Sequence, residues 1–263
     1  MHDTNSLALD LGRRALASMA GLRRTLLDSI LPPRCLACTE ATETPQGLCA
    51  ACWRDTAFVA GTACVKCGLP MPGDSGLEDI CESCLRHPPA WDEGAAAMLY
   101  SGAGRRMVLQ LKHGDRLDMV PRLAAWMAAA GAGPLGRADM IAPVPLHWRR
   151  LIRRRYNQSA ELARRLGKQA DRPVVNDLLV RQRMTVPQDG MNRAARAANQ
   201  QGAFIVNPRH AGRITGKAIL LVDDVLTSGA TLSSCADTLR TAGAARIDVL
   251  VLARVAFADS LHI

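Results

Sequence analysis

The chain has 263 residues, of which 48% are hydrophobic, so it is long enough for two domains and can bury a sizeable core. It has no apolar run near the ~18 residues that a membrane span needs, and its first residues lack the basic-then-apolar order of a signal peptide. We therefore expect a cytoplasmic protein without a transmembrane segment. The formal net charge of +9 is uneven, because residues 93–263 carry +12 and residues 35–92 carry −5. Anionic partners are expected on the C-terminal two thirds.

Residues 7–31 predict an amphipathic helix, and the two prolines that follow end it. We treat residues 1–33 as a separate N-terminal segment that docks on this protein or on a partner. The alternative is a helix on a membrane surface, which would make the protein membrane-associated through this segment or through a partner. The apolar positions with helical spacing are Leu16, Met19, Leu22, Leu26 and Ile30.

Eight of the nine cysteines form four C-x-x-C pairs within residues 34–90. Two thiolates three residues apart on a tight turn can reach one tetrahedral ion, and two such turns complete a Cys₄ site. The sequence therefore predicts two structural Zn²⁺ sites, while a disulfide framework is the weaker alternative because nothing indicates export. The predicted ligands are Cys35, Cys38, Cys49, Cys52, Cys64, Cys67, Cys81 and Cys84.

The pairing of these turns has two solutions. Sequential pairing joins the first pair with the second and the third with the fourth, and the short intervening loops favour it. A cross-braced arrangement would join the first with the third and the second with the fourth. Either way, metal is expected to supply much of the folding energy of this loop-rich segment. We expect the segment to brace the next domain or to contact a protein partner.

From Trp91 onward, helical and strand patterns alternate, which predicts a parallel sheet with helices on both faces. Helices are expected over 104–111, 120–130 and 157–170. Strands are expected over 95–100, 140–144, 174–175, 178–180, 203–206, 218–222 and 247–251. The ligand of such a domain should lie beyond the C-terminal ends of the strands.

The stretch from Ala218 to Leu232 combines features that suit a sugar phosphate. Its first five apolar residues predict a buried strand, and Asp223 and Asp224 stand where that strand is expected to end. A loop of small and hydroxyl residues then leads to a helix N-terminus, whose N–H groups and dipole attract phosphate. Gly229 lets the backbone approach the ligand, and the carboxylates can accept from ribose hydroxyls, directly or through Mg²⁺. The alternative is an ordinary strand followed by a helix-capping turn.

This run resembles the ribose-5-phosphate motif of type I phosphoribosyltransferases, which bind phosphoribosyl pyrophosphate (PRPP). The resemblance implies that Asp223 and Asp224 lie at the ribose diol as catalytic residues and that PRPP binds with Mg²⁺. It places the following loop around the 5′-phosphate. The loop residues that it assigns to PRPP are Val225, Leu226, Thr227, Ser228, Gly229, Ala230 and Thr231.

A wider set of motifs occurs in a characteristic order. After the cysteine pairs come LKHGDR at 111–116, PVPLHWRRLIRRRYNQS at 143–159 and TVPQDGMNRAARAANQQGAF at 185–204, and the PRPP motif closes the series. Over residues 31–256 the chain resembles the ComF family of competence-associated, amidophosphoribosyltransferase-like proteins. The resemblance implies a double zinc ribbon (34–90) fused to a type I phosphoribosyltransferase domain (91–263). It also implies a link to the uptake or use of external DNA and to other DNA-uptake proteins.

Five arginines lie within seven positions of the second motif. By the resemblance, Arg149 and Arg150 fall in the loop that receives pyrophosphate, where they would neutralise the leaving group; a solvated surface is the alternative. The density of the cluster also suits a nucleic-acid backbone, and an aromatic ring beside it could stack on bases or simply pack. The candidate nucleic-acid residues are Arg153, Arg154, Arg155 and Tyr156. The family usually has Gly-Phe at the last two positions.

The polar segment from 181 to 199 corresponds to the flexible loop of type I phosphoribosyltransferases, which closes to exclude water from the ribose. Its candidate contacts are Gln188, Arg193 and Arg196. Lys112, in the first motif, is a candidate phosphate or ion-pair residue, with an exposed lysine at a helix end as the alternative.

The motifs and the charge distribution are compatible with two functions. The first is an enzyme that displaces pyrophosphate from Mg²⁺·PRPP or binds a related ribose phosphate. The second is a non-catalytic factor that handles single-stranded DNA and keeps the fold as a phosphate-binding platform. The intact acidic pair and loop support the first, whereas the arginine cluster and the uneven charge support the second.

Overall fold

The computed structural model describes residues 33–42, 44–73, 79–147, 151–152, 154–182 and 202–256. They divide into two compact units, one ending at Trp53 and the other beginning at Arg54. The helix expected over 7–31 lies outside the described residues. Within the described ranges, no helix combines the length and the apolar character that crossing a membrane requires.

Short turns and single helical turns carry the cysteine pairs. An isolated antiparallel bridge joins Arg34 to Ala41 around the first pair, and another joins Ala63 to Pro70 around the third. The second and fourth pairs lie at the starts of two short helices, α2 (Ala50–Arg54) and α3 (Glu82–Arg86). Elements this short bury little apolar surface by themselves, so a bound metal would contribute to their folding.

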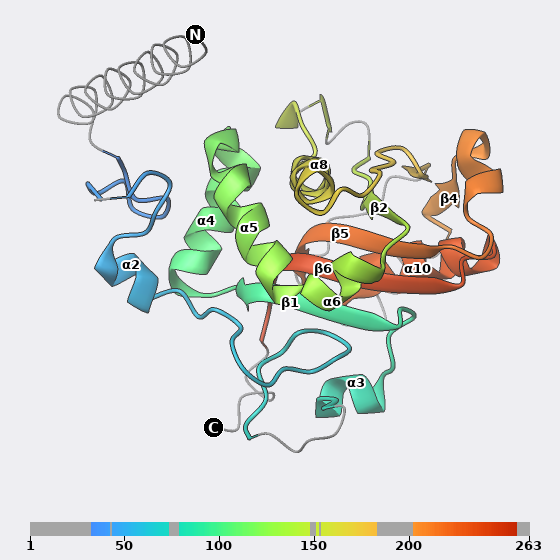
Figure 1. Ribbon diagram of the computed structural model, residues 1–263, viewed down its shortest axis with the longest axis horizontal. Coiled ribbons are helices and arrows are strands. Elements are labelled where there is room, and N and C mark those ends of the chain that lie inside the picture. The colour runs from blue at the N-terminus through green and yellow to red at the C-terminus, as the bar shows by residue number, and fades with distance from the viewer. Residues whose placement is uncertain are drawn as a thin grey trace, which may run out of the picture. The chain divides into compact units, whose positions relative to one another are not determined.

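The larger unit is built on a four-stranded parallel sheet with the order β1-β6-β5-β2, which confirms the expected fold class (Figure 1). Each connection between strands of this sheet passes through at least one helix, as parallel pairing requires. The sheet therefore brings strands that are distant in the sequence side by side. Its strands are β1 (Glu93–Leu99), β2 (Met140–Pro143), β5 (Ala218–Leu226) and β6 (Arg246–Arg254).

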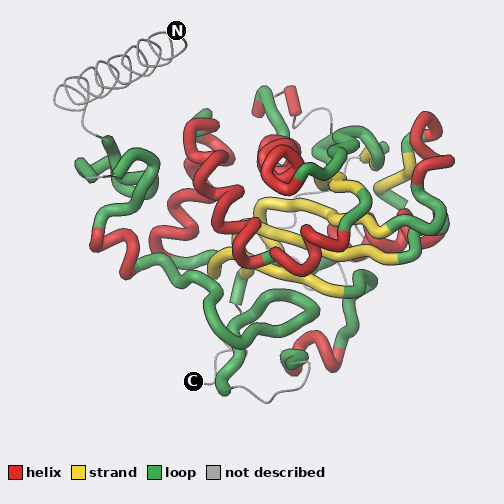
Figure 2. The backbone as a smooth tube through the Cα atoms, viewed as in Figure 1, coloured by secondary structure: helices red, strands yellow, loops and turns green. Residues whose placement is uncertain are grey.

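Helices cover both faces of this sheet, as the alternating pattern predicts (Figures 1 and 2). Alternate residues of a strand face opposite sides, and Ile219 and Leu221 pack in one apolar cluster with residues of α10. The four helices on the opposite face are α4 (Gly102–His113), α5 (Val120–Ala130), α6 (Ala132–Arg137) and α8 (Gln158–Ala170), whereas α10 spans Ala230–Thr241. Two 3₁₀ helices, η1 (Leu117–Met119) and η2 (Pro208–Arg213), lie in the connections.

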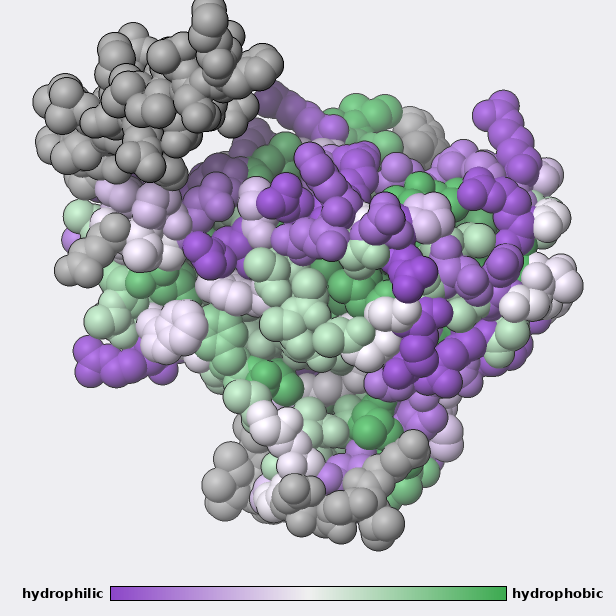
Figure 3. Space-filling view, in the orientation of Figure 1, coloured by the Kyte–Doolittle hydropathy of each residue, from purple (hydrophilic) through white to green (hydrophobic). Residues whose placement is uncertain are grey.

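The outer side of α8 is hydrophilic. Figure 3 shows hydrophilic side chains gathered over α8, where Arg164 and Lys168 are exposed. Leu162 and Leu166 of the same helix are fully buried. This division is the amphipathic pattern expected of a helix that packs on a sheet.

Two expected strands form a separate antiparallel pair outside the main sheet. β3 (Leu179–Arg181) pairs with β4 (Phe204–Val206), and Leu179 lies opposite Val206. Antiparallel strands can be joined directly by a loop, without the helical crossover that parallel strands need. β3 and β4 therefore form a two-stranded antiparallel ribbon.

The strand before the phosphate-type loop is longer than the sequence predicts. β5 continues from Ala218 to Leu226, so Asp223, Asp224, Val225 and Leu226 lie inside the strand and not beyond its end. The reason is that β6 extends equally far and keeps pairing, with Leu226 opposite Arg254. Polar residues alone do not end a strand whose neighbour still offers hydrogen-bond partners.

Gly167, on the buried side of α8, tests how tightly this helix packs. A Cβ there would lie 2.2 Å from Val174 Cγ2 and 2.8 Å from the Arg172 carbonyl oxygen. We expect Gly167→Ala to lower the free energy of unfolding by about 1–3 kcal/mol, because overpacking outweighs the gain in helix propensity. Chemical denaturation measures this change.

Gly136 in α6 is the matched control, since a Cβ there meets nothing within 4 Å. Gly136→Ala should leave stability unchanged or raise it by up to about 1 kcal/mol. Equal effects of the two substitutions would contradict the close packing of α8.

Candidate functional site

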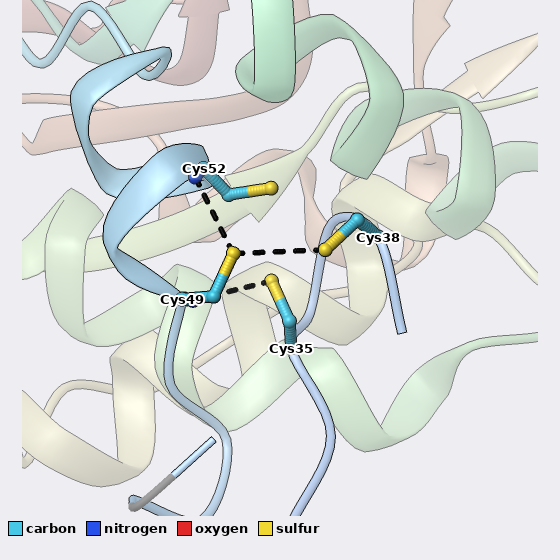
Figure 4. A group of neighbouring side chains, drawn as sticks. All are labelled: Cys35, Cys38, Cys49 and Cys52. Atoms are coloured by element: carbon cyan, nitrogen blue, oxygen red, sulfur yellow. Dashed lines mark hydrogen bonds between the residues drawn. The ribbon is translucent and has the colours of Figure 1, made fainter. Parts of the chain in front are cut away.

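Four cysteines of the smaller unit converge on one point. Figure 4 shows the sulfurs of Cys35, Cys38, Cys49 and Cys52 turned toward one another, and all four lie within 4.8 Å of one another. The Sγ atoms of Cys38 and Cys49 are 3.7 Å apart. Although burial alone would raise it, the pKa of Cys35 is lowered to about 6 by backbone N–H groups of Cys49 and Ala37. A thiolate is the form that binds metal.

The other four paired cysteines form an equivalent group in the larger unit. Cys64, Cys67, Cys81 and Cys84 are buried and within the same distance limit. The Sγ atoms of Cys67 and Cys81 are 3.7 Å apart, and the backbone N–H of Cys81 donates to Cys64 Sγ over 3.3 Å.

The two groups confirm sequential pairing and overturn the cross-braced alternative. All nine cysteines are described, and every one is a free thiol, so the disulfide alternative is also wrong. Four thiols fit structural zinc, which takes four sulfurs in tetrahedral geometry. The ninth cysteine, Cys235, belongs to α10 and is buried in the core on the inner face of that helix.

The acidic pair of β5 is held by side chains from two helices. Lys112, in the last turn of α4, places its Nζ 3.0 Å from Asp224 Oδ1. Ser159, in the first turn of α8, donates its hydroxyl to Asp223 Oδ1 over 2.8 Å. Lys112 is therefore an ion-pair residue in this structure. Among the described residues, Lys112 is the cation paired with the two carboxyl groups, so the pair has an excess negative charge when both are ionised.

Asp223 differs from an ordinary aspartate in its proton affinity. Burial, followed by the neighbouring charge of Asp224, raises its pKa from 3.8 to about 7. The Ser159 hydroxyl and the Lys112 ammonium act in the opposite direction. The carboxyl thus changes charge near neutral pH, and a cation or several hydroxyl donors would favour its ionised form.

The loop after β5, residues 227–231 (the phosphate loop), leads directly into α10. Gly229 is the N-cap residue with φ of +81°, so no side chain caps the helix. The N–H groups of the first turn of a helix have no intrahelical partner and can receive an anion. Ala230 and Thr231 already belong to this turn. Ser228 Oγ is buried and has no hydrogen-bond partner among the described residues.

The motif around 151–159 connects this site to α4. Tyr156 donates its hydroxyl to the Leu111 carbonyl over 2.6 Å, and Asn157 caps α8 by accepting from the Ser159 N–H. Arg155 has φ of +65°, which explains why a glycine is usual at this position in the resembled family. The Tyr156 hydroxyl is thus used within the chain, while its ring remains half-buried.

A hollow of about 480 Å³ opens beside the acidic pair. Arg154 and Arg155 line it, and the exposed Arg155 guanidinium lies 3.7 Å from Asp115. We call this feature the basic hollow, and its lining residues are Lys112, His113, Asp115, Arg154 and Arg155. Four of the five are basic residue types, so the hollow suits an anion.

Several sequence-predicted residues lie outside the described residues. They include the candidate pyrophosphate contacts and one member of the arginine cluster, together with all three candidates in the flexible loop. These residues are Arg149, Arg150, Arg153, Gln188, Arg193 and Arg196.

Two residues that the sequence analysis did not select touch the site. Ser159 orients Asp223, and its only sequence signal is its place at the end of the motif that precedes α8. Arg254 ends β6 and donates from Nη1 to the Thr227 carbonyl over 2.9 Å and the Leu226 carbonyl over 3.3 Å. A charged residue directly after the apolar run from Val249 to Ala253 is the signal that could have identified it.

Family models match two parts of the chain. A double zinc ribbon domain matches residues 26–85, and a phosphoribosyl transferase domain matches residues 159–258. These regions contain the two cysteine groups and the segment from Ser159 through the acidic pair to Arg254.

Curated relatives extend the similarity over most of the chain. The DNA utilization protein YhgH of Escherichia coli K12 is 31% identical over 213 residues, which cover 79% of this chain and 90% of the relative. Competence protein F of Haemophilus influenzae is 28% identical over 227 residues, covering 84% and 96%. Among solved structures, a glutamine PRPP amidotransferase from B. subtilis aligns with a TM-score of 0.37 and 20% identity, over 54% of this chain and 30% of that chain.

The raised pKa of Asp223 predicts a pH-dependent stability. Its folded-state pKa of about 7 lies above the ordinary value of 3.8, so the folded protein loses stability as pH rises from about 4 to about 7. Asp223→Asn keeps an oxygen for the Ser159 hydroxyl but cannot ionise. We expect the difference in unfolding free energy between variant and wild type to grow in favour of the variant from about pH 5 to about pH 8.

Asp237→Asn, at an exposed position on α10, is the control for removing one acidic group. The difference in unfolding free energy between Asp237→Asn and wild type should not change from about pH 5 to about pH 8. If the difference in unfolding free energy between Asp223→Asn and wild type also did not change with pH, Asp223 would titrate as an ordinary carboxyl group.

Proposed function

Because the chain belongs to the ComF family, we propose that its C-terminal domain binds PRPP with Mg²⁺ and transfers the phosphoribosyl group with release of pyrophosphate. We extend to this chain the connection with DNA use and competence that the names of its relatives carry. We also propose that other DNA-uptake proteins are its partners.

One observation carries the PRPP proposal: the acidic pair, the phosphate loop and the α10 N-terminus are contiguous at one end of β5. Asp223 and Asp224 lie within five or six residues of Gly229, whose positive φ turns the chain into α10. A ribose that extends from the acidic pair to the loop would meet oxygen acceptors at its hydroxyls and N–H donors at its phosphate. This order of groups matches the polarity of a ribose 5-phosphate.

The charges support a ligand that contains both a cation and a phosphate. Lys112 offsets only part of the negative charge of the acidic pair. Carboxylate oxygens are ligands that Mg²⁺ accepts, and Mg²⁺ normally keeps several waters and substrate oxygens besides. Asp223 and Asp224 would hold it or the ribose hydroxyls, and the ion would neutralise the pyrophosphate.

In the proposed transfer, the bond between ribose C1 and pyrophosphate breaks while a nucleophile bonds to C1. The chain contributes by orienting the ribose through the acidic pair and by fixing the 5′-phosphate at the loop. On their sequence alone, we assign neutralisation of the leaving pyrophosphate to Arg149 and Arg150. We assign exclusion of water to Gln188, Arg193 and Arg196 on the same basis.

Calorimetric titration of the zinc-loaded protein with Mg²⁺·PRPP tests the proposal. We expect binding by wild type and at least about tenfold weaker binding by the double variant Asp223→Asn with Asp224→Asn, because both ribose acceptors lose their charge. Release of pyrophosphate in the presence of nucleobases or single-stranded DNA would then identify the acceptor.

Asp237→Asn again serves as the control and should bind like wild type. Absence of PRPP binding by the wild-type protein would overturn the proposal. Equal affinity of the double variant and wild type would remove the acidic pair from the binding site.

The basic hollow favours a second function, binding of single-stranded DNA. Arg154 and Arg155 lie in it beside Lys112, and a phosphate backbone is attracted by such a concentration of cations. Lys112 lines the hollow and also pairs with Asp224, so the hollow lies next to the acidic pair. A strand bound there would lie close to the proposed ribose phosphate.

Replacing Arg154 and Arg155 together by alanine tests this second function. We expect weaker binding of an oligonucleotide and a salt dependence whose logarithmic slope falls by about 1.4, because two phosphate contacts are lost. The matched control replaces Arg164 and Arg213, which are exposed elsewhere on the unit. Identical slopes for the two double variants would exclude the hollow as a DNA site.

A further inference from the structure

The second cysteine group is packed directly against the main sheet. Its first turn, which holds Cys64 and Cys67, meets β1 through a hydrogen bond from the Gly94 N–H to the Val65 carbonyl of 2.8 Å. A Cβ on Gly68 would lie 2.5 Å from the Ala96 nitrogen. The turn therefore cannot shift on β1 without losing this contact.

Trp91 connects the same turn to the phosphate loop. Its indole N–H donates to the Lys66 carbonyl, between the two cysteines of the turn, over 2.6 Å. On its other side, the ring limits the space at Gly229, where a Cβ would lie 2.9 Å from Trp91 Cη2. Trp91 is only 4% exposed, so the ring is a rigid spacer between the cysteine turn and the N-cap of α10.

Arg254 holds the loop from the end of β6. Its guanidinium donates to the carbonyls of Leu226, Thr227 and Val255 and is almost fully buried. The Val255 N–H donates to the Leu226 carbonyl over 2.9 Å as well. These bonds determine where the backbone leaves the sheet and enters the phosphate loop.

One small cavity joins these groups. Its volume is about 40 Å³, and its lining includes Cys67, Cys84, Trp91, Ser228 and Arg254. It has room for a water molecule. Residues of the phosphate loop, the Arg254 guanidinium and the cysteine group therefore line one partly open space, and the same apolar cluster contains the four cysteines and Leu226.

We propose that the second Cys₄ site shapes the phosphate loop, with Trp91 and Arg254 as positioning residues, so that zinc at this site controls the affinity for a phosphate ligand. This inference rests on the proposed PRPP function of the loop. The physical reason is that a short ribbon without metal has too little core to keep its turn folded. Trp91 would then lose its acceptor at Lys66, and the cavity wall formed by Cys67 and Cys84 would no longer confine Arg254.

The first Cys₄ site provides an internal control, because its cysteines belong to the other compact unit. Loss of a zinc ion from either site is the same chemical change. Among the described residues, the turn of the second site accepts a hydrogen bond from Trp91, and its cysteines line a cavity with Arg254. The two sites should therefore differ in their effect on the loop.

The test uses the full chain and combines zinc content, hydrogen exchange of residues 226–231 and Mg²⁺·PRPP binding. Replacing Cys81 and Cys84 by serine should leave one zinc, speed exchange of the loop and weaken binding by at least about tenfold. Replacing Cys49 and Cys52 should also leave one zinc, with loop exchange unchanged and affinity within about twofold of wild type.

Arg254→Gln and Trp91→Phe keep the proposal falsifiable if the cysteine variants unfold. Both should retain two zinc ions, and both should speed exchange at residues 226–231 but not at Leu162–Leu166 of α8. Arg254→Lys, which keeps a cationic donor, should recover part of the protection. Unchanged loop exchange in Arg254→Gln, or equal effects of the two cysteine double variants, would overturn the inference. Because exchange is measured without ligand, absence of PRPP binding by wild type would defeat the proposed function alone.

Discussion

The parallel pairing of β5 with β6 is the constraint on which the candidate site depends. β5 lies between β6 and β2, and Leu220, Leu221 and Val222 are fully buried. A slip of one residue would turn its apolar residues to the wrong faces, so the register is strongly specified. Because that register continues until Leu226 lies opposite Arg254, the acidic pair, the start of the phosphate loop and the arginine that holds it are fixed together.

The charged groups near the C-terminal end of β5 favour the binding of a ligand. Among the described residues, Asp224 has an ion-pair partner in Lys112, whereas Asp223 accepts from neutral donors, the Ser159 hydroxyl and the Asp224 N–H. The resulting rise in the pKa of Asp223 reflects the free energy needed to ionise it in this environment. A cation or a ribose diol would lower this free energy, and the uncapped α10 N-terminus nearby favours an anion. The acidic pair thus suits a cation or hydroxyl groups, and the α10 N-terminus suits an anion, so one ligand with both kinds of group would fit the site.

The two cysteine groups have the same ligands but different surroundings. The first is formed by turns of the smaller unit, whereas the second contributes its cysteines to the main apolar cluster together with Leu226 and Trp91. We propose that a metal at the second group influences the phosphate loop as well as local folding. The same four ligands therefore occur in two different surroundings.

The sequence by itself determined the features that depend on nearby residues. The spacing of the cysteines predicted both metal groups, and the alternation of apolar patterns predicted the parallel sheet, α8 and α10. The order of acidic pair, loop and glycine located the candidate site, because a strand, a turn and a helix start are encoded within about fifteen residues.

Only the tertiary structure decided which distant groups meet. Ser159 bonds to Asp223 across 64 residues of sequence, and Lys112 reaches Asp224 from a different helix. The extension of β5 to Leu226 depends on the length of β6, and the contact of Trp91 with the Cys64–Cys67 turn depends on how that turn packs on β1. Hydrogen bonds and packing between remote segments follow from the path of the backbone in space, which no local pattern of residues specifies.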